Sequence, residues 1–225
     1  MFKHNQLQLY HVPLSVAGDD EIVRTCKLPV VLPHELIHAL YKYHRPRFLR
    51  RFHVGEGQLL QDVWSLSSRC TWFREHPGQQ DVLRDPLSCI PLRVHGDDVP
   101  VSERIGKLNV INFCSAIIRG GTSYATRHPM VAFKCGTYFD LDDLYHTLAW
   151  SFQVLLDGKM PSHDQDGKAL TGRRASMQGE DVAGGFKFLL AQFLSDLAYS
   201  KDALQLECNW QADQLCYECD GHAAA

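Results

Sequence analysis

The sequence predicts an α/β fold in which a helical N-terminal part is followed by a mixed sheet and a C-terminal Cys/His tail. Two observations favour this order. Two apolar runs with helical spacing occur early in the chain, whereas short runs rich in Val, Ile and Phe, interleaved with one amphipathic helix, occur later. We therefore expect a mostly helical region at 1–80 and an α/β region at 86–225.

Composition narrows the class of protein. The 225 residues are 45% hydrophobic and 22% charged, which is enough to bury a core. With 23 basic and 26 acidic side chains the net charge is -3, which excludes a polybasic DNA-coating protein. The start of the chain lacks an apolar core of signal-peptide length, and no apolar run has the length of a membrane span. We expect an intracellular protein, nuclear or cytoplasmic, with no membrane partner.

The N-terminal region is expected to contain two helices. Prolines punctuate residues 1–32, which predicts an irregular or extended lead-in. Pro33 suits the first position of a helix, and apolar residues then recur at helical spacing until Arg45 and the proline after it end the run. A second helix is expected over Gln58–Phe73, because its apolar residues again recur at helical spacing before Pro77.

The following segment predicts three strands in succession. Each is a short apolar or alternating run closed by glycine or aspartate, which is typical of strands joined by turns. The runs are Cys89–His95, closed by Gly96, Asp97 and Asp98; Leu108–Ile118, closed by Gly120 and Gly121; and Met130–Cys135, closed by Gly136.

A helix, a long loop and a fourth strand are expected next. Asp140 is a suitable N-cap and Gly158 a suitable C-terminal residue for an amphipathic helix between them. Lys159–Gly185 has no periodicity and is expected to be a surface loop. The apolar run Gly185–Ser195 fits either a strand or a buried helix, and we favour a strand, with a short helix over Asp196–Leu206.

The first candidate site is a metal-binding motif. His34, Glu35 and His38 match HExxH, in which two histidines one helical turn apart bind zinc and the glutamate activates the bound water. A third ligand would be His44 or a downstream acid such as Glu56. The extended form of this motif has glycine where this chain has Tyr41, so the alternative is an ordinary amphipathic helix whose histidines cap it or face solvent.

The second candidate site consists of acidic residues at strand ends. Asp97 is expected to close the first strand and Asp196 the fourth, and if these strands are neighbours the two carboxylates converge at one edge of the sheet. Together with a third acid they could bind two Mg²⁺ ions about 4 Å apart for phosphodiester chemistry. The alternative is that each aspartate only caps a loop or a helix. No third acid is marked by the sequence.

The third candidate site is a zinc site in the tail. Four soft or borderline ligands lie within fifteen residues, and thiolates two residues apart suit a structural, tetrahedral site. They are Cys208, Cys216, Cys219 and His222. The alternative is free cysteines at a frayed terminus. The other five cysteines stand singly among apolar residues and are expected in the core: Cys26, Cys70, Cys89, Cys114 and Cys135.

A basic stretch between the two predicted helices could contact DNA. Its arginines alternate with aromatic residues, an arrangement that can bind phosphates, although a charge run is more often a solvated surface. The arginines are Arg45, Arg47, Arg50 and Arg51.

The order of these features resembles a known family. A strand leading to Asp97, two further strands, a helix, a strand leading to Asp196, a helix and a CxxC element resemble DDE-type transposases of the Kyakuja-Dileera-Zisupton kind. The resemblance covers about the C-terminal 60% of the chain and rests on order and spacing. It implies a ribonuclease H-like fold that presents metal-binding carboxylates at Asp97 and Asp196, with Cys216 and Cys219 as zinc ligands.

This resemblance sets the functional expectations. The family has a further strand and a helix bearing a third acid, and these are not found before Ala225. We therefore expect a transposon-derived, ribonuclease H-like fragment that is catalytically incomplete and binds DNA, structural Zn²⁺ and, if active, Mg²⁺. Two alternatives stay open: a zinc metallopeptidase built on the HExxH motif at 34–38, and a non-enzymatic binding module in which the cysteine cluster only stabilises the fold.

Overall fold

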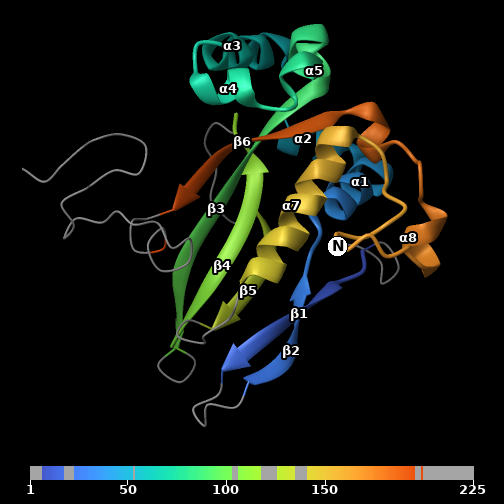
Figure 1. Cartoon of the computed structure of the whole chain (residues 1–225). Coiled ribbons are helices and arrows are strands. Elements are labelled where there is room, and N and C mark those ends of the chain that lie inside the picture. The colour runs from blue at the N-terminus through green and yellow to red at the C-terminus, as the bar shows by residue number, and fades with distance from the viewer. Residues whose placement is uncertain are drawn as a thin grey trace, which may run out of the picture.

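The computed structural model describes residues 7–17, 23–52, 54–102, 106–117, 126–134, 141–195 and 199. These residues form a mixed α/β structure whose centre is a four-stranded sheet (Figure 1). Within this described part, no helix is long and apolar enough to cross a membrane.

The N-terminal lead-in is a β-hairpin. Strands β1 (Tyr10–Ala17) and β2 (Val23–Val30) pair antiparallel in a sheet of their own. Pro13 and Pro29 are accommodated because a two-stranded sheet consists only of edge strands, where a missing N–H is tolerated. The expected extended lead-in is therefore a paired one.

The helical region contains more breaks than the sequence predicts. Its helices are α1 (Pro33–Tyr43), α2 (Arg45–Phe52), α3 (Gly57–Ser67), α4 (Thr71–Glu75) and α5 (Gln79–Arg84), followed by the 3-10 turn η1 (Pro86–Ser88). Pro33 begins α1, as predicted. α1 ends at Tyr43, just before Arg45 and Pro46, as predicted. These two residues also begin α2, because proline is tolerated in the first turn of a helix. The single helix predicted over 58–73 is divided into α3 and α4.

The central sheet has the strand order β5-β4-β3-β6. Its strands are β3 (Cys89–Ser102), β4 (Gly106–Ser115), β5 (His128–Lys134) and β6 (Lys187–Ser195). Neighbours in the series β3, β4, β5 are antiparallel, whereas β6 is parallel to β3. The run at 185–195 is therefore a strand, as predicted, and the predicted short helix at 196–206 lies outside the described residues except for Tyr199.

Helix α7 (Asp142–Asp157) connects β5 to β6 and lies alongside the sheet (Figure 1). Its expected C-terminal signal is confirmed, because Gly158 is left-handed with φ 74°. Its N-cap is Leu141 and not Asp140, which lies outside the described residues. The expected surface loop after α7 contains α8 (Gly172–Ser176) and the 3-10 segment η2 (Val182–Gly185), and it buries Met160, Val182 and Ala183.

The main core includes residues from both halves of the chain. The side chains of Val12, Ile37 and Phe48 pack in one cluster with Phe113 and Leu155. A smaller cluster packs α3, α4 and α5 against the beginning of β3 and β6 and the end of α7, and it comprises Trp64, Phe73, Val82, Cys89, Leu156 and Leu189. The hairpin, α1, α2 and the central sheet thus share one core.

Candidate active site at the end of the mixed sheet

The two strands that lead to the predicted acidic residues are neighbours. β3 and β6 run parallel, and their register extends from the Cys89 and Lys187 pair to the Gly96 and Ser195 pair. Gly96 directly precedes Asp97, and Ser195 directly precedes Asp196 in the sequence. Asp196 itself lies outside the described residues. The two strands are therefore neighbours in the sheet, which the convergence of Asp97 and Asp196 requires.

Asp97 does not close its strand, contrary to the prediction. β3 continues to Ser102 and pairs with β4 beyond Asp97, which lies opposite Val110. Glycine and aspartate usually end strands, but here the hairpin between β3 and β4 supplies backbone hydrogen-bond partners for the longer strand. Asp97 therefore lies within a paired strand, one residue beyond the end of the pairing with β6.

The adjacent aspartates have different surroundings. Asp98 accepts a hydrogen bond from Lys107, whose Nζ is 2.6 Å from its Oδ2. The described residues give Asp97 no hydrogen-bond or ion-pair partner. Because side chains alternate along a strand, the two carboxylates point to opposite faces of the sheet. Of the two adjacent carboxylates, Asp97 is thus the one without a hydrogen-bond or ion-pair partner among the described residues.

The two faces of β3 differ in chemistry. Val94 and Gly96 lie on the face that packs into the core: Val94 is opposite Phe113, and a Cβ on Gly96 would meet the Tyr199 ring at 2.3 Å. Arg93, His95 and Asp97 occupy the other face and are half-buried. Arg93 and His95 were not among the predicted site residues, although the alternation in Arg-Val-His-Gly-Asp indicates that they share a face with Asp97.

The HExxH residues lie on α1 and are buried. His34 Nδ1 is 2.8 Å from Ser151 Oγ on α7, and its ring meets Trp150 edge to face. Burial, together with the positive charge of Arg174 and the proximity of His38, lowers the pKa of His34 to about 3. His34 is therefore a neutral, packed histidine at physiological pH.

The glutamate of the motif is held by an ion pair. Arg174 of α8 donates from Nε to Glu35 Oε1, and its Nη2 lies 3.3 Å from Glu35 Oε2. Arg174 Nη2 also donates to the Gln8 carbonyl oxygen at 3.1 Å, and its guanidinium lies over the Tyr10 ring. A carboxylate held in this two-point arrangement is positioned by an arginine and not by a metal-bound water.

The remaining candidate zinc ligands, His38, His44 and Glu56, lie on α1, at its end and before α3. His38 Nε2 is 3.6 Å from Glu180 Oε2, and burial, with Lys42 adding to it and Glu180 opposing it, lowers the pKa of His38. His44 caps the end of α1, and Glu56 precedes α3. No group of three His, Cys, Asp or Glu side chains is arranged to hold a metal ion within the described ranges. The surroundings of His34 and Glu35 do not fit a catalytic zinc site.

The predicted basic stretch forms α2. Arg45 stacks on the Tyr41 ring with its Cζ 3.8 Å from the centroid, and the exposed Arg47 and Arg50 have no carboxylate partner in the described part of the chain. Arg51 is half-buried, and burial, with Arg47 and Arg50 adding to it, lowers its pKa. The adjacent Phe52 stacks on His128, which lies opposite Phe113 in the sheet. α2 therefore packs on the core face, opposite to Asp97.

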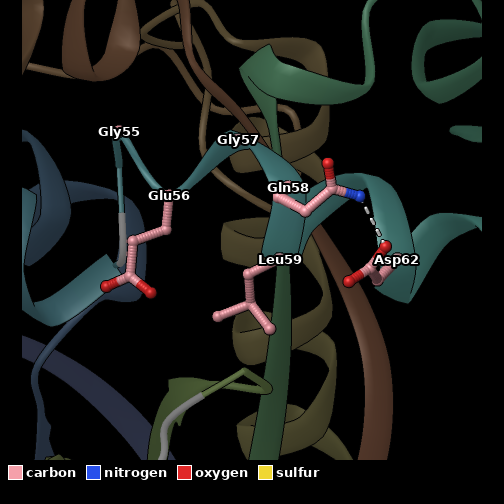
Figure 2. Close-up of a pocket in the computed structure, with 6 residues that line it drawn as sticks. All are labelled: Gly55, Glu56, Gly57, Gln58, Leu59 and Asp62. Carbon is pink, nitrogen blue, oxygen red and sulfur yellow. Dashed lines mark hydrogen bonds between the residues drawn. The ribbon is translucent and has the colours of Figure 1, made fainter.

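A separate depression lies at the start of α3. It has a volume of about 440 Å³ and is lined by Gly55, Glu56, Gly57, Gln58, Leu59 and Asp62. Figure 2 shows that Gln58 turns towards Asp62, to which its Nε2 donates a hydrogen bond of 2.8 Å. In the same view the Glu56 and Leu59 side chains point away from Asp62. Apart from Glu56, no predicted site residue lines this depression.

The tail predicted to bind zinc lies outside the described residues, including Cys208, Cys216, Cys219 and His222. No protein family matches the chain. No curated protein and no solved structure matches it either.

Proposed function

We propose that this chain is a transposase-derived, ribonuclease H-like domain that binds DNA and a divalent cation beside Asp97, where the pairing of β3 with β6 reaches Gly96 and Ser195. The observation that carries the proposal is the parallel pairing of these strands in the register Gly96 to Ser195, because it brings the sequences leading to Asp97 and Asp196 together. Ligands in α/β sheets commonly bind beyond such strand ends.

The order of the elements supports the ribonuclease H-like assignment. The resemblance implies a strand, two further strands, a helix, and a second acid-bearing strand. The described chain has β3, β4 and β5 as an antiparallel series, then α7, then β6 alongside β3. The acid-bearing strands, β3 and β6, are thus distant in sequence and adjacent in space.

The chemistry of Asp97 fits a hard cation. Mg²⁺ prefers carboxylate oxygens, and Asp97 has no competing ion pair among the described residues, unlike Asp98 with Lys107. Asp97 and Asp196 would hold the ion, which when bound would polarise a phosphodiester and its attacking water. Asp97 and Asp196 are the two proposed ligands of the cation, and DNA binding beside them is the proposed activity.

The test is cation affinity. Mn²⁺ replaces Mg²⁺ as a probe, and its binding is followed by electron paramagnetic resonance in the full chain and in Asp97→Asn, Asp196→Asn and Asp98→Asn variants. We expect the first two to weaken binding by at least about tenfold, since even outer-shell partners matter this much to metal sites. Asp98→Asn is the matched control, because it removes an adjacent carboxylate on the opposite face. Unchanged affinity in the first two variants, or a loss only in the control, would overturn the proposal.

A further inference from the structure

The face of the sheet that carries Asp97 also carries a basic cluster. Arg93 and His95 occupy the two preceding alternate positions of β3, and Arg127 directly precedes β5. Arg127 Nη1 is 3.1 Å from His95 Nδ1. An arginine of β3 and the arginine directly before β5 therefore bring cationic side chains to one face of the sheet.

The register of the sheet places the two arginines near each other. Arg93 lies opposite the buried Cys114 in the pairing of β3 and β4. Arg127 directly precedes His128, which lies opposite Phe113, the residue before Cys114. Both arginines thus flank the same part of β4, although 34 sequence positions separate them.

Among the described residues, neither arginine has a carboxylate partner. Arg93 Nη2 donates to the Ala116 carbonyl oxygen, and its enclosed Nε has no hydrogen-bond partner in the described part of the chain. Arg127 contacts His95 through Nη1. The same face holds Asn112, which is 93% buried with its Oδ1 unpaired. Within the described residues, this face therefore carries two guanidinium groups that no carboxylate contacts, which favours an anionic ligand.

We propose that Arg93 and Arg127 bind phosphate groups of a nucleic-acid backbone next to Asp97. Guanidinium groups are suited to phosphate oxygens because their donors match them in pairs. Arg93 and Asp97 are four residues apart on β3, or about 13 Å along the strand. Neighbouring phosphates of one DNA strand could therefore contact both, since they follow one another at a rise of about 3.4 Å along the helix axis. The inference rests on the proposed function and assigns to it the residues that would position the substrate.

This site differs from the basic stretch that the sequence analysis singled out. The α2 arginines lie on the core side of the sheet, because Phe52 packs on His128 opposite Phe113. Arg93 and Arg127 lie on the side of Asp97. A DNA backbone bound by Arg93 and Arg127 would therefore lie on the same side of the sheet as Asp97, whereas one bound by the α2 arginines would lie on the opposite side.

The experiment measures binding of a fluorescent 20-nucleotide DNA, single-stranded and duplex, by polarisation in EDTA. Arg93→Ala/Arg127→Ala is compared with Arg69→Ala/Arg84→Ala, which removes two exposed arginines from the α3–α5 region. We expect the first variant to raise Kd at least about tenfold and to lower the slope of log Kd against log salt by about 2, one for each lost phosphate contact. The control is expected to stay within about twofold.

Further variants separate recognition from folding. Arg127→Ala alone leaves the Arg93 to Ala116 hydrogen bond in place and is expected to weaken binding while the melting temperature is retained. Arg93→Lys/Arg127→Lys keeps the charge and is expected to restore binding in part. Unchanged binding in the folded Arg127→Ala variant, an equal loss in the Arg69 and Arg84 control, or displacement of DNA by micromolar inorganic phosphate would overturn the inference. Because EDTA removes divalent cations, this outcome is independent of the Mn²⁺ test of Asp97 and Asp196.

Discussion

Glu35 of α1 and Arg174 of α8 form an ion pair in the interior although 139 positions separate them in the sequence. The Glu35 side chain is 8% exposed and that of Arg174 15%. This pair links the segment after α7 to α1. Lys42 of α1 and Glu180 of the same segment form a second, exposed ion pair at 3.3 Å. The segment expected to be a surface loop is therefore fixed to the helix that carries HExxH.

Removing one partner of the interior pair is expected to destabilise the fold. Arg174→Met leaves the Glu35 carboxylate enclosed without a counter-charge and should lower the free energy of unfolding by about 3 kcal/mol or more, measured by urea denaturation. Glu35→Met/Arg174→Met removes both charges and should lose less. Lys42→Met is the exposed control, with an expected change within about 1 kcal/mol. Equal losses in the single and double variants would show that packing, not charge, dominates.

Two buried histidines predict a dependence of stability on pH. Burial lowers the pKa of His34 to about 3 and that of His128 to about 4, with nearby arginines contributing in both cases. Between these values and 6.5 the unfolded state binds protons that the folded state does not, so stability falls as pH decreases. Each histidine should contribute up to about 1.4 kcal/mol per pH unit in that window.

The check is denaturant unfolding at intervals from pH 7 to pH 4.5. Because glutamine does not bind this proton, His34→Gln should reduce the slope of the free energy of unfolding against pH by the contribution of one histidine. This holds whatever the substitution does to stability at pH 7. The matched control is His163→Gln, which makes the same substitution at a solvent-exposed histidine. An equally steep slope in His34→Gln would contradict the assignment.

Gly96 is expected to tolerate no side chain. A Cβ at this position would lie 2.3 Å from Cε1 of Tyr199, closer than real Cβ contacts allow. Gly96→Ala should therefore destabilise the protein by about 1–3 kcal/mol, measured by thermal unfolding. Gly57→Ala, whose Cβ would find Leu87 at 3.4 Å, is the matched control and should be nearly neutral. Gly96→Ala combined with Tyr199→Ala should lose less than the sum of the two single variants.

The described cysteines should differ in reactivity. Burial raises the pKa of Cys89 to about 12 and that of Cys114 above its usual value, whereas Cys70 is exposed, contrary to its expected place in the core. At pH 8 a maleimide should label Cys70 within minutes and the other two only after unfolding, as resolved by peptide mass spectrometry. Rapid labelling of Cys89 in the folded protein would contradict the burial of β3.

Zinc content distinguishes the two sequence-derived metal sites. If the tail binds zinc, Cys216→Ala/Cys219→Ala should lose about one equivalent by elemental analysis. His38→Gln should retain it, because the surroundings of His34 and Glu35 do not fit a zinc site. Zinc lost only in His38→Gln would favour the metallopeptidase alternative.

The sequence alone was sufficient for features that depend on neighbouring residues. The beginning of α1 at Pro33, the end of α7 at Gly158 and the strand at 187–195 follow from a fixed φ, a left-handed cap and an apolar run, each of which acts within a few residues. The sequence could place Asp97 near the strand that leads to Asp196 only if the two strands pair. In the structure β3 and β6 do pair.

Tertiary structure decided which distant groups meet. β3 extends past Gly96 because β4 supplies its hydrogen-bond partners, and the HExxH glutamate faces Arg174 because α8 packs on α1. Arg127, next to β5, reaches His95 of β3 because both strands pair with β4 in one sheet. Spacing in the sequence reports contacts within one helix or strand, whereas a buried ion pair such as that of Glu35 with Arg174 depends on how elements that are distant in the sequence pack against each other.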